Sequence, residues 1–315
     1  MLGGRNYCIL GKLFDLHMET TNTFEILLFY KYVGIQDPQV LMERERAVCS
    51  VLGLKGRIII AKEGINGTLE GTPDMTAKYR EHILSDKRFK NMDIKTSEGN
   101  GQAFPRLSVK VKPEIVSTKL PEHIDPTKET AVHLPAHELK KWYDEGKDFV
   151  VIDMRNDYEI KSGYFDKTVN PGLYASRDLP KALDKLRVHK DTTVVTVCTG
   201  GVRCEKMSAY LLDQGFKDVY QLHNGMHTFM EKYPGQHFNG TLFTFDNRIT
   251  MHWGGDERKI VGKCAVCDAT TENYRNCQNP VCNGKMLVCD KCAESRKEEM
   301  FCKDKTTCGK SVQVV

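Results

Sequence analysis

Hydrophobic and polar residues form blocks along the chain, and the lengths and spacings of these blocks are those of strands and helices. Phe24 to Tyr32 is rich in Ile, Leu, Phe and Tyr, which is typical of a buried strand. Asp37-Pro38 then provides a helix N-cap and a proline at the first helical position, and Gly53 provides the stop. The apolar residues between them that share one helical face are Val40, Leu41, Val48, Val51 and Leu52.

A second strand–helix passage follows the first. Gly56 to Ala61 predicts a short Ile-rich strand, Gly64 to Gly67 a turn, and Thr68 to Glu70 the returning strand of a hairpin. Thr72-Pro73 opens a second helix, and a last strand alternates between apolar and polar residues from Leu107 to Val111. The order β-α-β-β-α-β predicts a ferredoxin-like domain.

Beyond a proline-containing and charged stretch at Leu120 to Glu129, which predicts a linker, strands and helices alternate again. The helices expected there are Pro135–Trp142, Leu179–Leu186 and Arg203–Gln214, and the strands are Phe149–Asp153, Thr192–Val197 and Val219–Leu222. This alternation predicts a parallel sheet covered by helices. Thr192 to Val197 is strongly β-branched, so it is expected as a central strand.

From about Gly254 the pattern changes to short polar segments between cysteines, which hold too few large apolar residues to build a core unaided. The 315 residues therefore divide into three expected units. These are a ferredoxin-like domain at 1–119, a parallel α/β domain at 120–245 and a Cys-rich tail at 246–315. The fold class is α/β combined with α+β.

Composition and charge narrow the functional classes only slightly. The chain is 40% hydrophobic and 28% charged, as soluble proteins with real cores are, and its net charge of +4 permits a polyanionic partner without requiring one. No run of about 18 apolar residues is present to span a membrane. Residues 1–16 lack the continuous apolar core of a secretory signal. We therefore expect a cytoplasmic protein whose thiols stay reduced.

One cysteine stands where the strand Thr192 to Val197 should end and a helix should begin. The loop reads Cys198-Thr199-Gly200-Gly201-Val202-Arg203. Backbone N–H groups at a helix N-terminus point into such a loop, and Gly200 and Gly201 let several of them converge on one point. Arg203 adds a permanent cation. Together these groups are expected to lower the pKa of Cys198, so that the nucleophilic thiolate forms.

The length of this loop separates two chemistries. Four residues lie between Cys198 and Arg203, which resembles the loop of rhodanese sulfurtransferases, where a persulfide is held. The related cysteine phosphatases have five intervening residues. Val150–Arg155 and Val219–Met226 resemble the opening and closing segments of rhodanese domains. Cys204 is expected to be simply packed, and the alternative is a resolving thiol.

The tail predicts metal binding. Its cysteines are Cys264, Cys267, Cys277, Cys282, Cys289, Cys292, Cys302 and Cys308. Eight thiols would fill two structural Cys₄ zinc sites. The two Cys-x-x-Cys pairs, 264/267 and 289/292, would share one site in a crossed arrangement, and sequential use is the other possibility. Reduced thiols, disulfides or an iron–sulfur cluster remain as alternatives.

Basic residues gather near the last strand of the first domain. Arg106, Lys110 and Lys112 lie on or beside this strand, and Lys55 and Arg57 lie near another. Ferredoxin-like sheets often present one face to RNA, so the first three residues are candidates for RNA contacts. A merely solvated charged face is the alternative.

Taken together, residues from about 24 to 308 resemble the rhodanese-domain tRNA uridine hydroxylases. The stretches that carry the resemblance are Tyr30–Val33, Gly53–Arg57, Ala61–Thr68, Arg106 with Val109–Lys112, Cys198–Lys206, Phe245–Arg248 and the cysteine tail. The resemblance implies oxygen-dependent hydroxylation of the wobble uridine of tRNA to 5-hydroxyuridine. Molecular oxygen would be a co-substrate, and Cys198 would be the active cysteine and pass through a persulfide. The resemblance identifies neither the sulfur donor nor the reductant.

Two other hypotheses compete with this one. A rhodanese-type sulfurtransferase would move sulfane sulfur to a thiol or to RNA, and a binding module would use the fold only as a scaffold. A scaffold needs neither Cys198 nor Arg203, so their presence argues against it. Binding of RNA would distinguish the hydroxylase from the sulfurtransferase.

Overall fold

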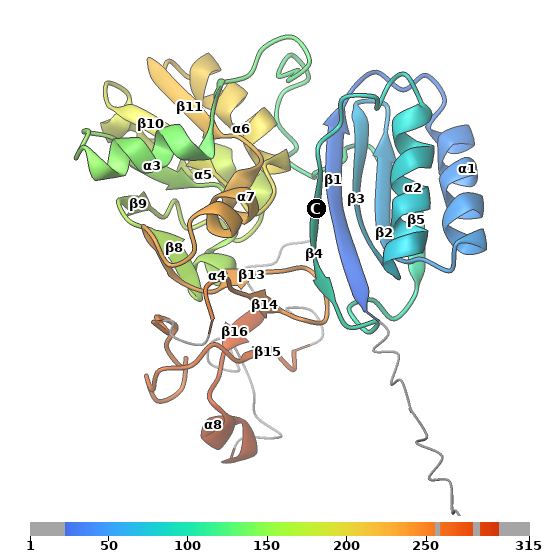
Figure 1. Ribbon diagram of the computed structural model, residues 1–315. Coiled ribbons are helices and arrows are strands. Elements are labelled where there is room, and N and C mark those ends of the chain that lie inside the picture. Colours follow the sequence, from blue (N-terminus) through green and yellow to red (C-terminus); the bar gives the residue numbers. More distant parts are fainter. Residues whose placement is uncertain (1–22, 256–258, 280–283, 296–315) are drawn as a thin grey trace, which may run out of the picture.

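The computed structural model describes residues 23–255, 259–279 and 284–295. Two αβ domains lie side by side, and a smaller part that begins near residue 242 lies below them in Figure 1. Among the described residues, no helix combines the length and apolar character that crossing a membrane requires.

The first domain is a sheet with helices on one face. Its elements are β1 (Phe24–Tyr32), α1 (Pro38–Val51), β2 (Lys55–Ala61), β3 (Gly64–Gly71), α2 (Pro73–Ser85), β4 (Ile94–Gly99) and β5 (Leu107–Val111). The strand order is β4-β1-β3-β2-β5, with β5 parallel to β2. Leu27, Phe29 and Ile58 point toward α1 and α2 and belong to the buried core of this domain. The opposite face of the sheet is turned toward the second domain (Figure 1).

The predicted β-α-β-β-α-β order is confirmed, but the last strand was assigned wrongly. The fourth strand of the motif is Ile94–Gly99, which pairs with β1, and Leu107–Val111 is an additional strand at the other edge of the sheet. The sequence Ile-Lys-Thr-Ser-Glu-Gly holds one large apolar residue, so its pattern gave no strand signal. Pairing with β1 along six positions, from Phe24 to Phe29, decides it instead.

The predicted turn at Gly64 to Gly67 is also wrong, because these residues already belong to β3. The hairpin turns at Lys62 and Glu63 instead. Gly64 is needed for close packing of strands: a Cβ there would lie 2.1 Å from the carbonyl oxygen of Lys31 on β1.

The expected apolar face of α1 was displaced as well. Val40 and Val51 are 60% and 88% exposed. The buried residues of the helix are Leu41, Met42, Glu45 and Cys49. Glu45 interrupts the apolar pattern, and it is buried because the Tyr79 hydroxyl donates a hydrogen bond to its carboxylate at 3.0 Å.

The second domain is the expected parallel sheet covered by helices. Its sheet has the order β6-β11-β10-β7-β9, so the strand predicted to be central, β10, is central. The strands are β6 (Val132–Leu134), β7 (Val150–Asp153), β8 (Gly163–Phe165), β9 (Thr168–Val169), β10 (Thr193–Val197), β11 (Asp218–Leu222) and β12 (Phe238–Gly240), the last pairing with β8 outside the main sheet. The helices are α3 (Ala136–Asp144), α4 (Asp157–Ile160), η1 (Ser176–Asp178), α5 (Leu179–Leu186), η2 (Arg187–His189), α6 (Val202–Asp213) and α7 (Gly225–Lys232).

The C-terminal part consists of short elements that pack on α4. They are β13 (Leu242–Phe243), β14 (Thr250–Met251), β15 (Tyr274–Asn276), β16 (Lys285–Leu287) and α8 (Asp290–Ser295). Its apolar contacts with the second domain include Tyr158 against Phe243. The Tyr274 hydroxyl donates to the carbonyl of Tyr158 at 2.5 Å. The first 22 residues lie outside the described part of the chain.

Candidate active site at the Cys198 loop

The loop that follows β10 holds the Cys198 sulfur at the start of α6. Gly201 precedes the first residue of α6 with a left-handed φ of +101°. A Cβ at Gly201 would also lie 2.7 Å from the Tyr30 hydroxyl of the first domain. Glycine therefore serves twice here, because it allows the left-handed turn and lets the sheet of the first domain approach.

Hydrogen bonds and charge converge on the Cys198 sulfur. The N–H of Gly201 donates to it over 3.2 Å. Burial acts to raise the pKa of Cys198, but the Cys204 thiol, the Arg203 guanidinium and the backbone N–H groups of these two residues lower it to about 6. The direction agrees with the expectation from sequence. The lowered pKa favours the thiolate form of Cys198.

Cys204 faces Cys198 from the first turn of α6 and is fully buried. Burial and the neighbouring Cys198 raise the pKa of Cys204 well above its ordinary value, so it stays a thiol and donates to the Cys198 sulfur. Both cysteines are free. Cys204 is therefore packed, as expected, but it also acts on the reactive sulfur.

Arg203 is held by a carboxylate to which sequence reasoning had given no role. Its two terminal nitrogens donate to Glu159 at 2.6 and 2.8 Å, and one of them also donates to Thr199 Oγ1 at 3.3 Å. Both side chains of this ion pair are buried. Glu159 further accepts the backbone N–H of Asn156 at 2.9 Å, just before α4. Glu159 thus positions Arg203 and offsets part of its charge.

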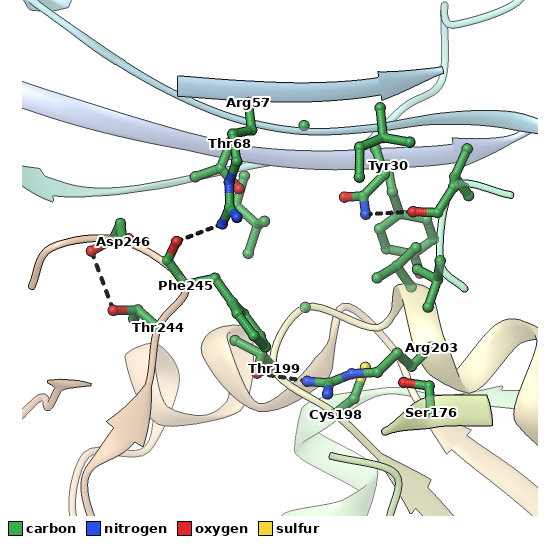
Figure 2. A pocket seen from close by; sticks show the side chains of 18 of the residues that line it. Tyr30, Arg57, Thr68, Ser176, Cys198, Thr199, Arg203, Thr244, Phe245 and Asp246 are labelled. Atoms are coloured by element: carbon green, nitrogen blue, oxygen red, sulfur yellow. Dashed lines mark hydrogen bonds between the residues drawn. The ribbon is translucent and has the colours of Figure 1, made fainter. Parts of the chain in front are cut away.

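The open face of the first domain's sheet forms the opposite wall of a cavity of about 680 Å³ that contains Cys198, Thr199, Gly200, Val202 and Arg203. Figure 2 shows Tyr30, Thr68 and Arg57 projecting from the sheet toward the loop. Basic residues from all parts of the chain line this cavity: Arg57, Lys112, Lys119, Arg203 and Arg248. The lining acids Glu114 and Asp246 are paired with Lys206 and Arg248. The cavity is therefore net basic.

The first turns of α6 bind the two domains together. The Tyr30 hydroxyl donates to Glu205 at 3.0 Å, and the Tyr32 hydroxyl donates to the carbonyl of Val202 at 3.2 Å. Lys206, which is buried, donates to Glu63 at 3.0 Å and to Glu114 at 2.6 Å. Helix α6, which follows the reactive loop, thus also holds in place the sheet of the first domain that faces this loop.

A third part of the chain completes the cavity. The carbonyl of Phe245 accepts a hydrogen bond from Arg57 at 2.5 Å. Asn247 N–H donates to Ala103 at 2.9 Å, and Arg248 donates to Ser97 Oγ at 3.0 Å. The stretch Phe245–Arg248 therefore docks on the first domain although it follows the second.

Two of the three residues predicted to contact tRNA, Lys110 and Lys112, lie near this cavity. Lys112 lines the cavity. Lys110 on β5 lies opposite Ile59 on β2, and Ile59 lines the cavity as well. Arg106 is exposed just before β5. Lys110 and Lys112 therefore lie beside the Cys198 cavity, on the face of the sheet away from its helices.

Four of the predicted metal ligands come together. The Sγ atoms of Cys264, Cys267, Cys289 and Cys292 lie within 4.8 Å of one another. The Sγ atoms of Cys267 and Cys289 are 3.7 Å apart, close to the roughly 3.8 Å that a tetrahedral zinc with Zn–S of about 2.3 Å requires. This grouping is the crossed arrangement. Cys277 is buried outside the group, and Cys282, Cys302 and Cys308 lie outside the described residues.

A thiolate in a rhodanese loop, enclosed by a second αβ domain, defines a rhodanese-fold thiol enzyme. Comparison with known families agrees. Residues 24–115 match the UPF0176 acylphosphatase like domain, residues 135–232 the Rhodanese-like domain and residues 239–309 the Rhodanase C-terminal family.

Comparison over most of the chain identifies one family within this class. A tRNA uridine(34) hydroxylase of Cytophaga hutchinsonii is 41% identical over 285 residues, which is 90% of either chain. One of Staphylococcus aureus is 41% identical over 268 residues, 84% of either chain. A solved rhodanese-like domain protein from Staphylococcus aureus is 29% identical and covers 32% of this chain and 91% of its own, with a TM-score of 0.27. The chain belongs to the tRNA uridine(34) hydroxylase family.

Sequence reasoning missed the roles of Glu159, Glu205, Lys206 and Phe245. Glu205, Lys206 and Phe245 lie inside segments that resemble the family, and Glu159 lies just after one, but the partners of all four are far away in the chain. Glu159 lies 44 positions from Arg203, and Glu63 lies 143 from Lys206. A signal was present only as charged residues next to the reactive loop, and their burial is a tertiary property.

Proposed function

We propose that this protein hydroxylates uridine 34 of tRNA at C5, with Cys198 as the reactive residue and molecular oxygen as the co-substrate. The observation that carries the proposal is the basic cavity in front of the Cys198 thiolate. A flexible anticodon nucleotide can enter such a cavity, while Lys110 and Lys112 beside it, together with the exposed Arg106, meet the phosphates. The identity of 41% with hydroxylases over 90% of the chain supports the same assignment. We place this activity in the cytoplasm, where thiols stay reduced.

The net reaction sets what must be supplied. One oxygen atom of O₂ is inserted into the C5–H bond of uracil, which gives the hydroxyl, and the other leaves as water, which requires two electrons and two protons. We assign these to an external thiol donor that is oxidised to its disulfide.

Cys198 is proposed to work as a persulfide. Its thiolate attacks the outer sulfur of a sulfane donor such as thiosulfate, the S–S bond of thiosulfate breaks, and sulfite leaves with the bond's electron pair. The Gly201 N–H and Arg203 are placed to stabilise the terminal anionic sulfur.

Mass spectrometry of tRNA nucleosides tests the function. Cells that lack the gene should lose 5-hydroxyuridine and its derivatives when oxygen is present and no parallel pathway operates, and a plasmid copy should restore them. A copy with Cys198→Ser should fail to restore them, and one with Cys204→Ser should restore more. If the purified protein does not bind tRNA at low salt but transfers sulfur efficiently from thiosulfate, the protein is a sulfurtransferase instead.

We also propose a structural zinc ion held by Cys264, Cys267, Cys289 and Cys292, because their four thiols already meet at tetrahedral spacing. A closed Cys₄ site leaves no open position for a substrate, so the metal would stabilise the C-terminal part rather than react. The second site expected from the sequence would use Cys277 with Cys282, Cys302 and Cys308.

A further inference from the structure

Phe245 is an exposed aromatic residue at the edge of a buried aromatic cluster. Its neighbour Phe243 is 1% exposed and packs edge-on against Tyr274, whereas Phe245 is 46% exposed. Single exposed aromatics are common on protein surfaces, so exposure alone carries little weight. Phe245, however, lines the cavity that contains Cys198.

The position of the Phe245 ring is determined by residues on both sides. Its carbonyl is held by Arg57, and its ring packs edge-on against Phe243 with centroids 5.4 Å apart. The following residues are fixed as well, because Asp246 and Arg248 form an ion pair of 2.7 Å and Asn247 binds Ala103. A ring held in this way needs little further ordering when a ligand binds.

The ring faces the reactive loop. The guanidinium carbon of Arg203 lies 5.7 Å from the centroid of the Phe245 ring. Figure 2 shows the Phe245 side chain reaching from its segment down to Thr199, beside Cys198 and Arg203. Arg203 thus lies over one face of the ring, and a flat group that stacks on the other face lies in the cavity that contains Cys198.

We infer that Phe245 is the platform on which the target pyrimidine base stacks; this inference rests on the proposed function. Unpaired bases of RNA are bound by stacking on aromatic side chains, which tolerates any ring face and needs no hydrogen bond to the base. The cavity of about 680 Å³ has the size of a site for one nucleotide.

Among the described residues, an unpaired polar atom also lies buried in the wall of this cavity. Nδ1 of His227 on α7 is buried in the wall of the same cavity and has no hydrogen-bond partner within the described part of the chain. Burial, together with Lys95 and Arg248, lowers the pKa of His227 to about 4, so the imidazole is neutral at physiological pH.

Binding of two RNA stem-loops tests the stacking. One is the anticodon stem-loop with uridine at position 34, and the other is identical but abasic there; both carry a 5′ dye for anisotropy. The wild-type protein should prefer the first by about tenfold, since stacking of a base on an aromatic ring is worth roughly this factor or more. Phe245→Ala and Phe245→Leu should bind both equally, and Phe245→Tyr should keep the preference. The leucine retains apolar packing against Phe243, so it separates loss of the aromatic face from loss of folding.

Tyr164→Ala is the matched control, since Tyr164 is 38% exposed outside the cavity and its removal should leave the preference intact. If Phe245→Leu retains the preference while the wild type makes 5-hydroxyuridine, the platform is refuted and the proposed function stands. If the wild type neither binds the stem-loops nor makes 5-hydroxyuridine, the proposed function fails and the inference falls with it.

Discussion

At the scale of single residues, the reactivity of Cys198 depends on donors that lie within a few residues of it in sequence. Burial in an apolar domain core works against a thiolate. The loop outweighs this effect of burial on the pKa of Cys198, because the Gly201 N–H, the Cys204 thiol and Arg203 all converge on its sulfur atom. This makes the contribution of each donor measurable through the titration of the thiol.

The rate of alkylation of Cys198 by iodoacetamide is expected to rise with pH around a midpoint near 6, below the ordinary value of about 8.5. Cys204→Ala should move this midpoint upward, because it removes a donor to the thiolate. Cys204→Ser should move it less, since a hydroxyl can donate in place of the thiol. A midpoint near 8.5 in the wild type would refute the electrostatic account of this loop.

The buried pair between Arg203 and Glu159 is expected to matter more for stability than for the charge on Cys198. Glu159→Gln leaves the Arg203 charge uncompensated, which should lower the free energy of unfolding by about 3–5 kcal/mol. The same change should lower the pKa of Cys198 further, because the guanidinium charge is no longer offset. Denaturant unfolding and the alkylation profile measure the two effects separately.

The control for this change is Asp184→Asn on α5. Its partner Arg187 is 3.3 Å away, but the side chains are 59% and 86% exposed. Such a surface pair contributes about 0–1 kcal/mol. Equal losses of stability in the two variants would contradict the buried-pair argument.

At the scale of elements, the C-terminal part shows how short segments depend on one cluster of side chains. Its strands β15 and β16 have three residues each, and its small core includes Cys264 and Cys292 themselves. Elements of this size do not fold on apolar burial alone. The thiol cluster is therefore expected to hold them together through a metal.

Removal of zinc by a strong chelator should unfold residues after about 260, because metal binding and folding are coupled in such sites. Hydrogen exchange would show rapid exchange in β15, β16 and α8 with the two larger domains still protected. Metal analysis of the untreated protein should find zinc. An absorbance typical of an iron–sulfur cluster, or a folded tail without metal, would rule the zinc proposal out.

At the scale of the whole molecule, the cavity exists because three distant parts of the chain meet at α6. Lys206 on α6 connects the two domains, because its single ammonium group forms ion pairs with Glu63 and Glu114 of the first domain. Although burial acts to raise it, the pKa of Glu114 is below its usual range because Lys206 and nearby donors stabilise the carboxylate. The ion pair of Lys206 with Glu114 therefore stabilises the contact between the two domains above about pH 4.3. This stabilisation is lost as the pH falls below that value.

Lys206→Met should loosen the two domains, because it leaves two carboxylates facing each other without a cation. Proteases should then cut the connection around residues 120–131 about tenfold faster, since cleavage follows the population of the open form. Hydroxylation of tRNA should fall while Cys198 is still alkylated. Lys217→Met is the control, because its pair with Asp191 is about three-quarters exposed on both sides.

Neutralising Lys110 and Lys112 together should weaken binding of every tRNA. The slope of log affinity against log salt should fall by about one unit for each phosphate that the variant no longer neutralises. Sulfur transfer from thiosulfate at Cys198 should survive in this variant, because the lysines lie on the first domain and not in the loop. Binding titrations at several salt concentrations measure the slope. An unchanged slope would place the tRNA on another surface.

Much of the fold and the centre of the site could be predicted from the sequence, because both depend on neighbouring residues. Periodicity identified the strand–helix order of both domains, and the spacing of Cys198 and Arg203 identified the reactive loop. Paired Cys-x-x-Cys motifs identified the four cysteines that the structure groups together. Each of these signals is local, since strand pleat, helical turn and loop geometry act over a few residues.

The errors and omissions have one physical cause, which is contact between residues that are distant in the sequence. β4 is a strand because β1 needs a partner at that edge, although its own residues are polar. Glu45 and Glu159 are buried because hydrogen bonds from other elements satisfy their carboxylates. The cavity, its basic lining and the exposed ring of Phe245 arise only when the first domain and the C-terminal segment close over the Cys198 loop. The sequence by itself determined the reactive thiol, and the tertiary structure decided what that thiol faces.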